Sequence, residues 1–120
     1  MKVDEKHNLK MAKMNFAKIY PCYLNKIKKK GRTEAELMEI IKWLTGFDKL
    51  QIQDYIDREV NFEMFFNEAN LNPKASLITG VICGYRIEEI EFTLTKQVRY
   101  LDKLVDELAK GHAMNKILRE

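Results

Sequence analysis

The residue types with the most chemical potential gather in one stretch, LITGVICGYRIEEIE, from Leu77 to Glu91. It holds a thiol, a phenol and an arginine within four positions, and arginine is a planar fork that suits a carboxylate or a phosphate. One interpretation is a small-ligand pocket with the candidate binding residues Thr79, Cys83, Tyr85 and Arg86. The other is a structural bend in which Arg86 pairs with a neighbouring acid. Gly80 and Gly84 favour the bend, because glycines let another backbone approach closely.

Recognised catalytic and metal-binding motifs are missing from the sequence. The same stretch lacks the order of glycines and lysine that defines a phosphate loop. His7 and His112 lie near opposite ends of the chain and share no ligand spacing with a cysteine or an acid. Cys83 has no evident base beside it and lies in an apolar run, where we expect a buried, unreactive thiol. We therefore predict no catalytic residue, no metal and no cofactor, and the chain leans toward a non-enzymatic role.

Three carboxylates near the C-terminus could form a general acid–base pair. Asp102 and Asp106 are four residues apart and share one helix face, and Glu107 follows them. Lys103 and Lys110 stand nearby, a pattern typical of a solvated helix with mixed charge. We interpret these carboxylates as part of an exposed charged face.

Positive charge is concentrated at the start of the chain. Residues 1–32 carry ten Lys and Arg against two acids, a balance of +8, whereas residues 33–120 carry eleven against sixteen, a balance of −5. A basic segment could contact nucleic-acid phosphates without reading base sequence. It could equally be the solvated face of a first helix that packs on an acidic body. The candidate phosphate-contacting residues are Lys26, Lys28, Lys29, Lys30 and Arg32.

The elements that must carry these groups are predicted to be helical. The 120 residues are 46% hydrophobic and 32% charged, and only five glycines and two prolines are available for turns. Apolar residues recur at steps of three and four. We therefore predict an all-α fold, a compact bundle of about five or six helices. An irregular Gly-containing connection is expected around residues 77–86, because no partner strand is evident, with a helical turn resuming at residues 86–90.

Pro21 interrupts the first periodic segment, since proline removes a backbone donor and clashes inside a helix. We expect irregular structure up to about Tyr20 and a firm helix from Pro21 to Lys30. Residues 1–14 are predicted to form a mobile basic N-terminus, and residues 15–120 a single helical domain.

Capping residues place the next helices. Thr33 and Glu36 form a capping box, in which each side chain bonds the other residue's amide, and Gly46 suits the end of that helix. Asp48 and Asn61 are predicted N-caps of the two shorter helices that follow.

The longest regular apolar pattern lies in the last third of the chain. Its residues step by 4, 3, 4 and 3, which is a heptad-like seam of about two heptads. A seam this short is either part of the core or a helical dimer face. The candidate self-association residues are Leu94, Val98, Leu101, Val105 and Leu108.

Compartment follows from what the sequence lacks. No apolar run is long enough to cross a bilayer, so no membrane contact is expected. The N-terminal residues lack the apolar core of a secretion signal. Two cysteines, Cys22 and Cys83, form no disulfide framework, and we predict a cytoplasmic protein with reduced thiols.

The whole chain resembles a bacterial family known as domain of unknown function 2200. The similarity is carried in order by IYPCYLNKIKKKGRTEAEL (19–37), IIKWLTGF (40–47), LITGVICGYRIEEIE (77–91) and VRYLDKLVDELAKGHAMNKILRE (98–120). The resemblance implies a small, mostly helical bacterial protein of one domain, and it implies no activity and no functional residue. Thr93 and His112 depart from the family pattern, which often has a proline near the first position and a lysine near the second.

Three functional hypotheses follow. The first is a non-enzymatic protein–protein interaction module that self-associates through the Leu94–Leu108 seam. The second is a weak, phosphate-directed nucleic-acid binder that uses residues Lys26–Arg32. The third is a small-ligand pocket around Cys83–Arg86.

Overall fold

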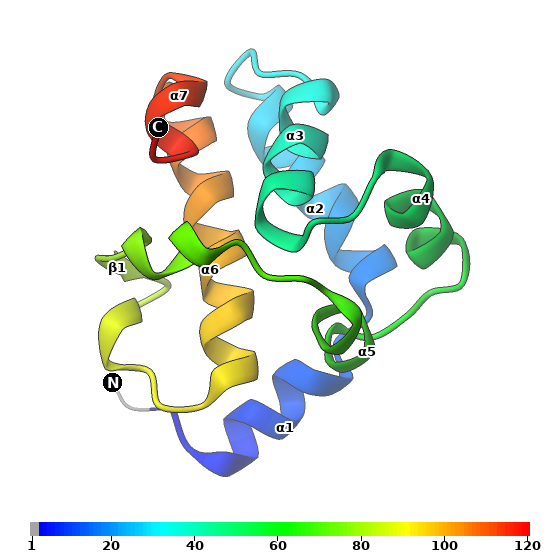
Figure 1. Cartoon of the computed structure of the whole chain (residues 1–120), viewed down its shortest axis with the longest axis vertical. Coiled ribbons are helices and arrows are strands. Elements are labelled where there is room, and N and C mark those ends of the chain that lie inside the picture. Colours follow the sequence, from blue (N-terminus) through cyan, green and yellow to red (C-terminus); the bar gives the residue numbers. More distant parts are fainter. Residues whose placement is uncertain (1–2) are drawn as a thin grey trace.

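The computed structural model describes residues 3–120 and contains, within them, seven α-helices, two short 3-10 helices and one β-hairpin (Figure 1). The all-α prediction is confirmed. The elements are α1 (Glu5–Lys13), α2 (Phe16–Lys28), α3 (Glu34–Thr45), α4 (Lys49–Asp57), α5 (Phe62–Glu68), η1 (Pro73–Leu77), β1 (Val81–Ile82), β2 (Tyr85–Arg86), η2 (Ile87–Glu89), α6 (Thr93–Ala109) and α7 (Met114–Ile117).

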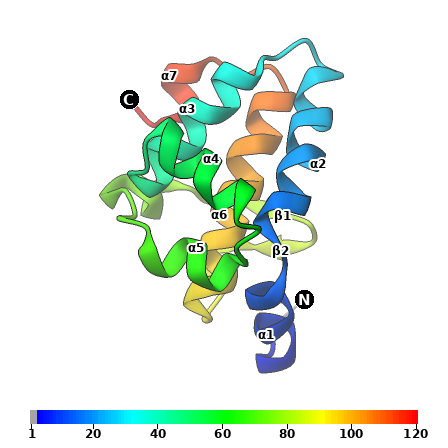
Figure 2. The same ribbon diagram turned by 90° about the vertical axis from the view of Figure 1, so that its right-hand side faces the viewer.

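Helix α6 is the axis around which the other elements pack. It contacts α1, α2, α3, α5, α7, β1 and η2. Figure 1 shows α1 crossing its N-terminal end and α7 folding back at its C-terminal end, and Figure 2 shows α2 alongside it. The predicted apolar seam is the inner face of this helix. Leu94 is half-buried. The other four seam residues are at most 1% exposed: Val98, Leu101, Val105 and Leu108.

Because the seam is buried within the chain's own core, it is not available as a dimer interface. The seam residues pack against the chain's own helices in one continuous core. A second copy could reach them only if the core opened, and a buried side chain of this kind stabilises the fold by about 1.5–3 kcal/mol. Self-association through Leu94–Leu108 is therefore incompatible with the folded monomer.

The prediction of irregular structure up to Tyr20 is wrong. Residues Glu5–Lys13 form α1, which begins at an Asp4 cap, and α2 begins at Phe16 rather than at Pro21. Burial of Phe16 and Tyr20, about 1.5–3 kcal/mol each, offsets the cost of about 3 kcal/mol for a proline inside a helix. The mobility of residues 1–14 stays a prediction, and the first two residues lie outside the described part.

A single β-bridge joins the start of α2 to the start of α5. The amide of Phe16 donates to the Val60 carbonyl, and the amide of Phe62 donates to the Met14 carbonyl, both at 2.9 Å. Between them, Asn15 and Asn61 each cap the helix that follows, and the Asn61 cap was predicted. The bridge anchors a cluster of stacked and edge-on rings: Phe16, Phe47, Tyr55, Phe62, Phe65 and Phe66.

The predicted capping box of α3 is present. The Thr33 hydroxyl accepts from the Glu36 amide, and the Glu36 carboxylate accepts from the Thr33 amide. Gly46 ends the helix at a φ of 75°. The predicted cap at Asp48 is also present, where Gln51 completes a second capping box.

Arg32 ties the α2–α3 turn to the end of α6. Its guanidinium donates to both carboxylate oxygens of Glu36 and to the carbonyls of Leu108 and His112, the latter at 2.8 Å. Carbonyls at a helix end carry partial negative charge, which a cation stabilises. The hydrogen bonds from Arg32 to Glu36, together with those from the Thr33 amide and hydroxyl, lower the pKa of the Glu36 carboxyl from its ordinary 4.5 to about 2.

The connection at residues 77–86 is a β-hairpin, so the expectation that no strand could pair there is wrong. Val81 faces Arg86 and Ile82 faces Tyr85, and the two-residue turn between them is Cys83-Gly84. Both turn residues have positive φ, 54° and 82°, as a type I′ turn requires. The partner strand lies within the same stretch, four residues further along the chain. The helical turn predicted for residues 86–90 is present as η2.

A fall in pH should lower the free energy of unfolding, because it protonates the Glu36 carboxylate. Because its folded pKa lies below its unfolded value, its contribution is complete above about pH 4.5 and disappears as the pH falls toward 2. We expect Glu36→Gln to lower the free energy of unfolding at pH 7 by about 1–2 kcal/mol and to flatten its decline between pH 5 and pH 2. Urea denaturation across this range measures both. Glu39→Gln, at an exposed position on the same helix, is the control, and an equal effect there would contradict the assignment.

The hairpin turn should gain stability from a better left-handed residue at position 83. A cysteine at positive φ is strained, whereas asparagine is common at this position of a type I′ turn. We expect Cys83→Asn to raise the free energy of unfolding by about 0.5–1 kcal/mol. Cys22→Asn, inside α2, should lower it instead. Chemical denaturation measures both changes in the free energy of unfolding. A loss of stability in Cys83→Asn would contradict the turn geometry.

Candidate functional site

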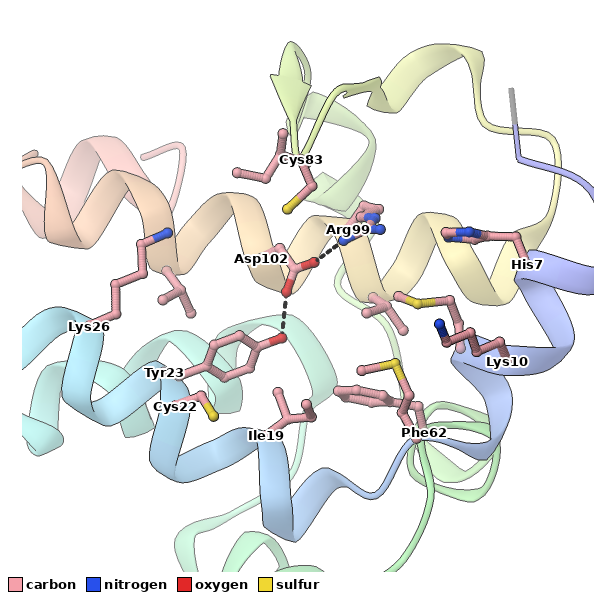
Figure 3. Close-up of a pocket in the computed structure, with 15 residues that line it drawn as sticks. His7, Lys10, Ile19, Cys22, Tyr23, Lys26, Phe62, Cys83, Arg99 and Asp102 are labelled. Atoms are coloured by element: carbon pink, nitrogen blue, oxygen red, sulfur yellow. Dashed lines mark hydrogen bonds and ion pairs between the residues drawn. The ribbon is translucent and has the colours of Figure 1, made fainter. Parts of the chain in front are cut away.

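A cavity of about 480 Å³ opens between α1, α2, α6 and the hairpin (Figure 3). This volume lies in the range of about 300–1,000 Å³ that is usual for small-molecule sites. Its apolar lining comes from elements distant in sequence: Met11, Met14, Ile19, Phe62, Ile82, Val98 and Val105. Met11, Phe62, Val98 and Val105 belong to the core, so the cavity floor is held by the same packing that holds the fold.

The polar part of the lining is centred on Asp102 of α6. The Tyr23 hydroxyl of α2 donates to Asp102 Oδ1 at 2.5 Å, and the Arg99 guanidinium donates to Oδ2 at 2.8 Å. Figure 3 shows this chain of contacts running from α2 to α6. Burial, together with the adjacent carboxylate, raises the pKa of the Tyr23 hydroxyl well above its usual range. Tyr23 therefore stays protonated at neutral pH and does not act as a base.

The carboxylates of α6 are not a solvated face, which corrects the sequence-based interpretation. Only 17% of the Asp102 side chain and 15% of the Asp106 side chain are exposed. Asp106 pairs with Lys26 of α2 and with Lys110, and Glu107 pairs with Arg119 beyond α7. Each carboxylate is thus held by a cation or a hydroxyl from an element that packs on α6.

Two contacts with the Tyr85 ring hold Arg99 and His7, which both line the cavity. The Tyr85 ring of β2 lies under the Arg99 guanidinium, 5.1 Å from its carbon to the ring centroid, and beside the His7 ring of α1 at 5.3 Å. Both Arg99 Nε and His7 Nε2 are buried and have no hydrogen-bond partner among the described residues. Unpartnered buried polar atoms are rare in folded proteins, and these two have no accessible surface through which a molecule in the cavity could reach them.

The rim of the cavity carries the more exposed groups: Lys10, Cys22, Lys26 and Cys83. The Cys22 thiol donates to the Lys18 carbonyl within α2. Cys83 is exposed at the tip of the hairpin, so the prediction of a buried thiol is wrong. The hairpin turn carries it out of the apolar run in which its neighbour Ile82 remains buried.

The four residues predicted to bind a ligand do not form one site. Cys83 lines the cavity, and Tyr85 supports Arg99 from behind. Thr79 and Arg86 are exposed and do not line it, and Arg86 forms no ion pair with the described residues, contrary to the expected pairing with an acid.

Sequence reasoning did not assign the residues that give the cavity its polarity to a binding site. It considered His7 only as a metal ligand and Asp102 as an exposed charge, and it gave Tyr23 and Arg99 no site role. These four residues are spread over 96 positions, from residue 7 to residue 102. One signal was available. Arg99 and Asp102 are three residues apart on a helix otherwise read as core and surface, a spacing at which two side chains can pair.

The predicted phosphate-contacting patch is only partly free. Arg32 is engaged by Glu36 and the end of α6, and Lys26 pairs with Asp106. Lys28, Lys29 and Lys30 are exposed. Nucleic-acid binding stays a prediction that can now involve these three lysines and not Arg32, whose donors are used within the fold.

Among residues 3–120, no group of three or more His, Cys, Asp and Glu side chains is arranged to hold a metal ion. None of the helices in that range combines the length and the apolar character needed to cross a bilayer.

Comparison with known proteins agrees with the resemblance seen in the sequence. A family model described as an uncharacterized protein conserved in bacteria (DUF2200) matches residues 10–119. The crystal structure of uncharacterized protein SP1917 is similar to this chain, with 39% sequence identity and a TM-score of 0.86. The similarity covers 92% of this chain and 91% of that one. No curated protein matches the chain.

The Tyr23–Asp102–Arg99 contacts should contribute unequally to stability. Tyr23→Phe leaves Asp102 paired with Arg99 and should cost about 1–2 kcal/mol. Asp102→Asn leaves Arg99, whose side chain is only 11% exposed, without a counter-ion. This change should lower the free energy of unfolding by about 3 kcal/mol. Urea denaturation of the two variants and of the double variant measures both terms and their coupling. A larger loss in Tyr23→Phe than in Asp102→Asn would contradict this order.

Proposed function

We propose that this chain, which belongs to the DUF2200 family of uncharacterized bacterial proteins, is a small-molecule-binding domain without catalysis of its own. The observation that carries the proposal is the cavity between α1, α2, α6 and the hairpin, which joins an apolar floor to a polar end lined by Arg99 and Asp102. Ligand sites in proteins have this composition, mostly apolar with a few placed polar groups.

Binding is favoured over catalysis by the state of the polar groups. The Tyr23 hydroxyl is committed to Asp102, and both oxygens of Asp102 already accept hydrogen bonds. Neither group is poised to take a proton from a substrate, because each would first have to leave a favourable partner. The thiols of Cys22 and Cys83 have no hydrogen bond to a base among the described residues. A cavity of this kind can retain a ligand without transforming it.

The interaction hypothesis loses its original support. It relied on the apolar seam of α6, which is core. Under the present proposal, contact with another protein would depend on a different surface, and the ligand cavity is the feature for which the fold gives the strongest physical reason.

A pocket-filling variant tests the proposal. Titration of the labelled protein with a fragment library of neutral, acidic and basic aromatics should give hits that shift the methyl resonances of Met11, Met14 and Ile82 in nuclear magnetic resonance spectra. Ile19→Trp should fill the cavity and weaken these hits about tenfold or more. Leu24→Trp is the matched control, because it makes a similar change at a half-buried position of α2 outside the cavity. A library without hits at these methyls, or hits equally strong in both variants, would refute the proposal.

A further inference from the structure

We infer that the ligand of this cavity is a small organic acid, an apolar body that ends in a carboxylate. This inference rests on the proposed binding function and specifies the chemical class of the ligand. It follows from three features of the cavity: which polar atoms lack partners, which charges are already neutralised, and where the apolar lining lies.

Arg99 forms the donor-rich end of the cavity. It donates from one terminal nitrogen to Asp102, whereas its other terminal nitrogen forms no hydrogen bond to the described residues and is not among the fully buried polar atoms. The Nε of Arg99 and the Nε2 of His7 are also unpartnered, but they have no accessible surface, so a ligand in the cavity cannot reach them. A guanidinium can only donate hydrogen bonds. This end of the cavity therefore calls for an acceptor.

The local charge calls for an acceptor that is negative. The lining includes three cations, Lys10, Lys26 and Arg99, and one carboxylate, Asp102. Arg99 forms an ion pair with Asp102. Lys26 forms an ion pair with Asp106, which does not line the cavity. Lys10 forms no salt bridge to the residues that the structure describes. It lies three residues after His7 on α1, and positions three apart share a helix face. Figure 3 shows both side chains at the α1 end.

A cationic ligand fits less well, although a carboxylate lines the cavity. Asp102 already accepts from the Tyr23 hydroxyl and from Arg99, so its charge is compensated. The positive head group of a cationic ligand would lie near the positive charges of Arg99 and Lys10 and would find no free carboxylate to bind. A neutral apolar ligand would fill the floor but would cover the free terminal nitrogen of Arg99 without giving it an acceptor, and a buried donor without a partner costs about 1–3 kcal/mol.

The remaining lining sets the body of the ligand. Beyond the polar end, the wall is formed by thioether, aliphatic and aromatic side chains from α1, α2, α5 and α6: Met11, Met14, Ile19, Phe62, Val98 and Val105. Methionine side chains adapt to ligands of varied shape. An acid with a short aliphatic or aromatic tail would place its carboxylate near Arg99 and Lys10 and its tail among these residues.

Three probes that differ only in their head group test the inference. Phenylbutyrate, phenylbutanol and phenylbutylamine share one apolar body and carry a negative, a neutral and a positive head. Isothermal titration of the full chain at pH 7 and low salt should give an affinity for phenylbutyrate about tenfold above that for phenylbutanol, with phenylbutylamine weakest.

Variants locate the preference. Lys10→Gln, at an exposed position, should lower the affinity for phenylbutyrate about threefold, because one cation near the carboxylate is lost. The affinity for phenylbutanol should not change. Arg99→Gln should abolish the preference for the acid. Lys6→Gln changes an exposed lysine on the same helix that does not line the cavity, and it should leave all three affinities unchanged.

Each contrary outcome has a distinct meaning. Equal affinities for the three probes, or tightest binding of the amine, would overturn the inference and leave the binding function intact. An equal loss in Lys6→Gln and Lys10→Gln would assign the preference to general surface charge and would also overturn it. If none of the three probes binds and the fragment library gives no cavity hits, the binding function itself fails.

Discussion

The structure depends on the need to neutralise two carboxylates that are largely buried on the central helix. Asp102 and Asp106 lie one turn apart on α6, and each is more than four-fifths covered. A carboxylate in such surroundings is tolerated only when it is paired and hydrogen-bonded. The partners come from α2, where Tyr23 and Lys26 lie three residues apart and reach Asp102 and Asp106 respectively. This matched spacing fixes α2 beside α6 in one register, which apolar packing alone would specify less sharply.

The cavity is a consequence of that register. With α2 held beside α6 by polar contacts, the gap between them is closed at one end by α1 and along one side by the hairpin. Asn8 of α1 accepts from the Thr95 amide and hydroxyl near the start of α6, which keeps α1 across that end. The hairpin turn places Tyr85 under Arg99. Stability and site thus share residues, so variants of Tyr23, Asp102 or Arg99 will change both, whereas Lys10 and Ile19 allow binding to be changed more independently.

Membership of an uncharacterized bacterial family, together with a solved relative of high structural similarity, establishes the fold and leaves the activity to be argued from the site. The contacts around the cavity favour retention of a ligand. Asp102 is satisfied by Tyr23 and Arg99, whereas the other terminal nitrogen of Arg99 and the ammonium of Lys10 have no partner among the described residues. That contrast within one cavity distinguishes structural polarity from polarity that is left for another molecule.

The sequence by itself determined the local elements whose signals lie within a few residues. The all-α class, the capping box at Thr33, the caps at Asp48 and Asn61 and the long amphipathic helix all follow from spacing and side-chain chemistry. Only the tertiary structure decided the rest. Helix α2 continues through Pro21 because ring burial offsets the cost of the proline, and the seam of α6 is core because the other helices cover it. The cavity joins residues up to 98 positions apart, from His7 to Val105, and no local pattern encodes the packing that brings His7 and Asp102 together.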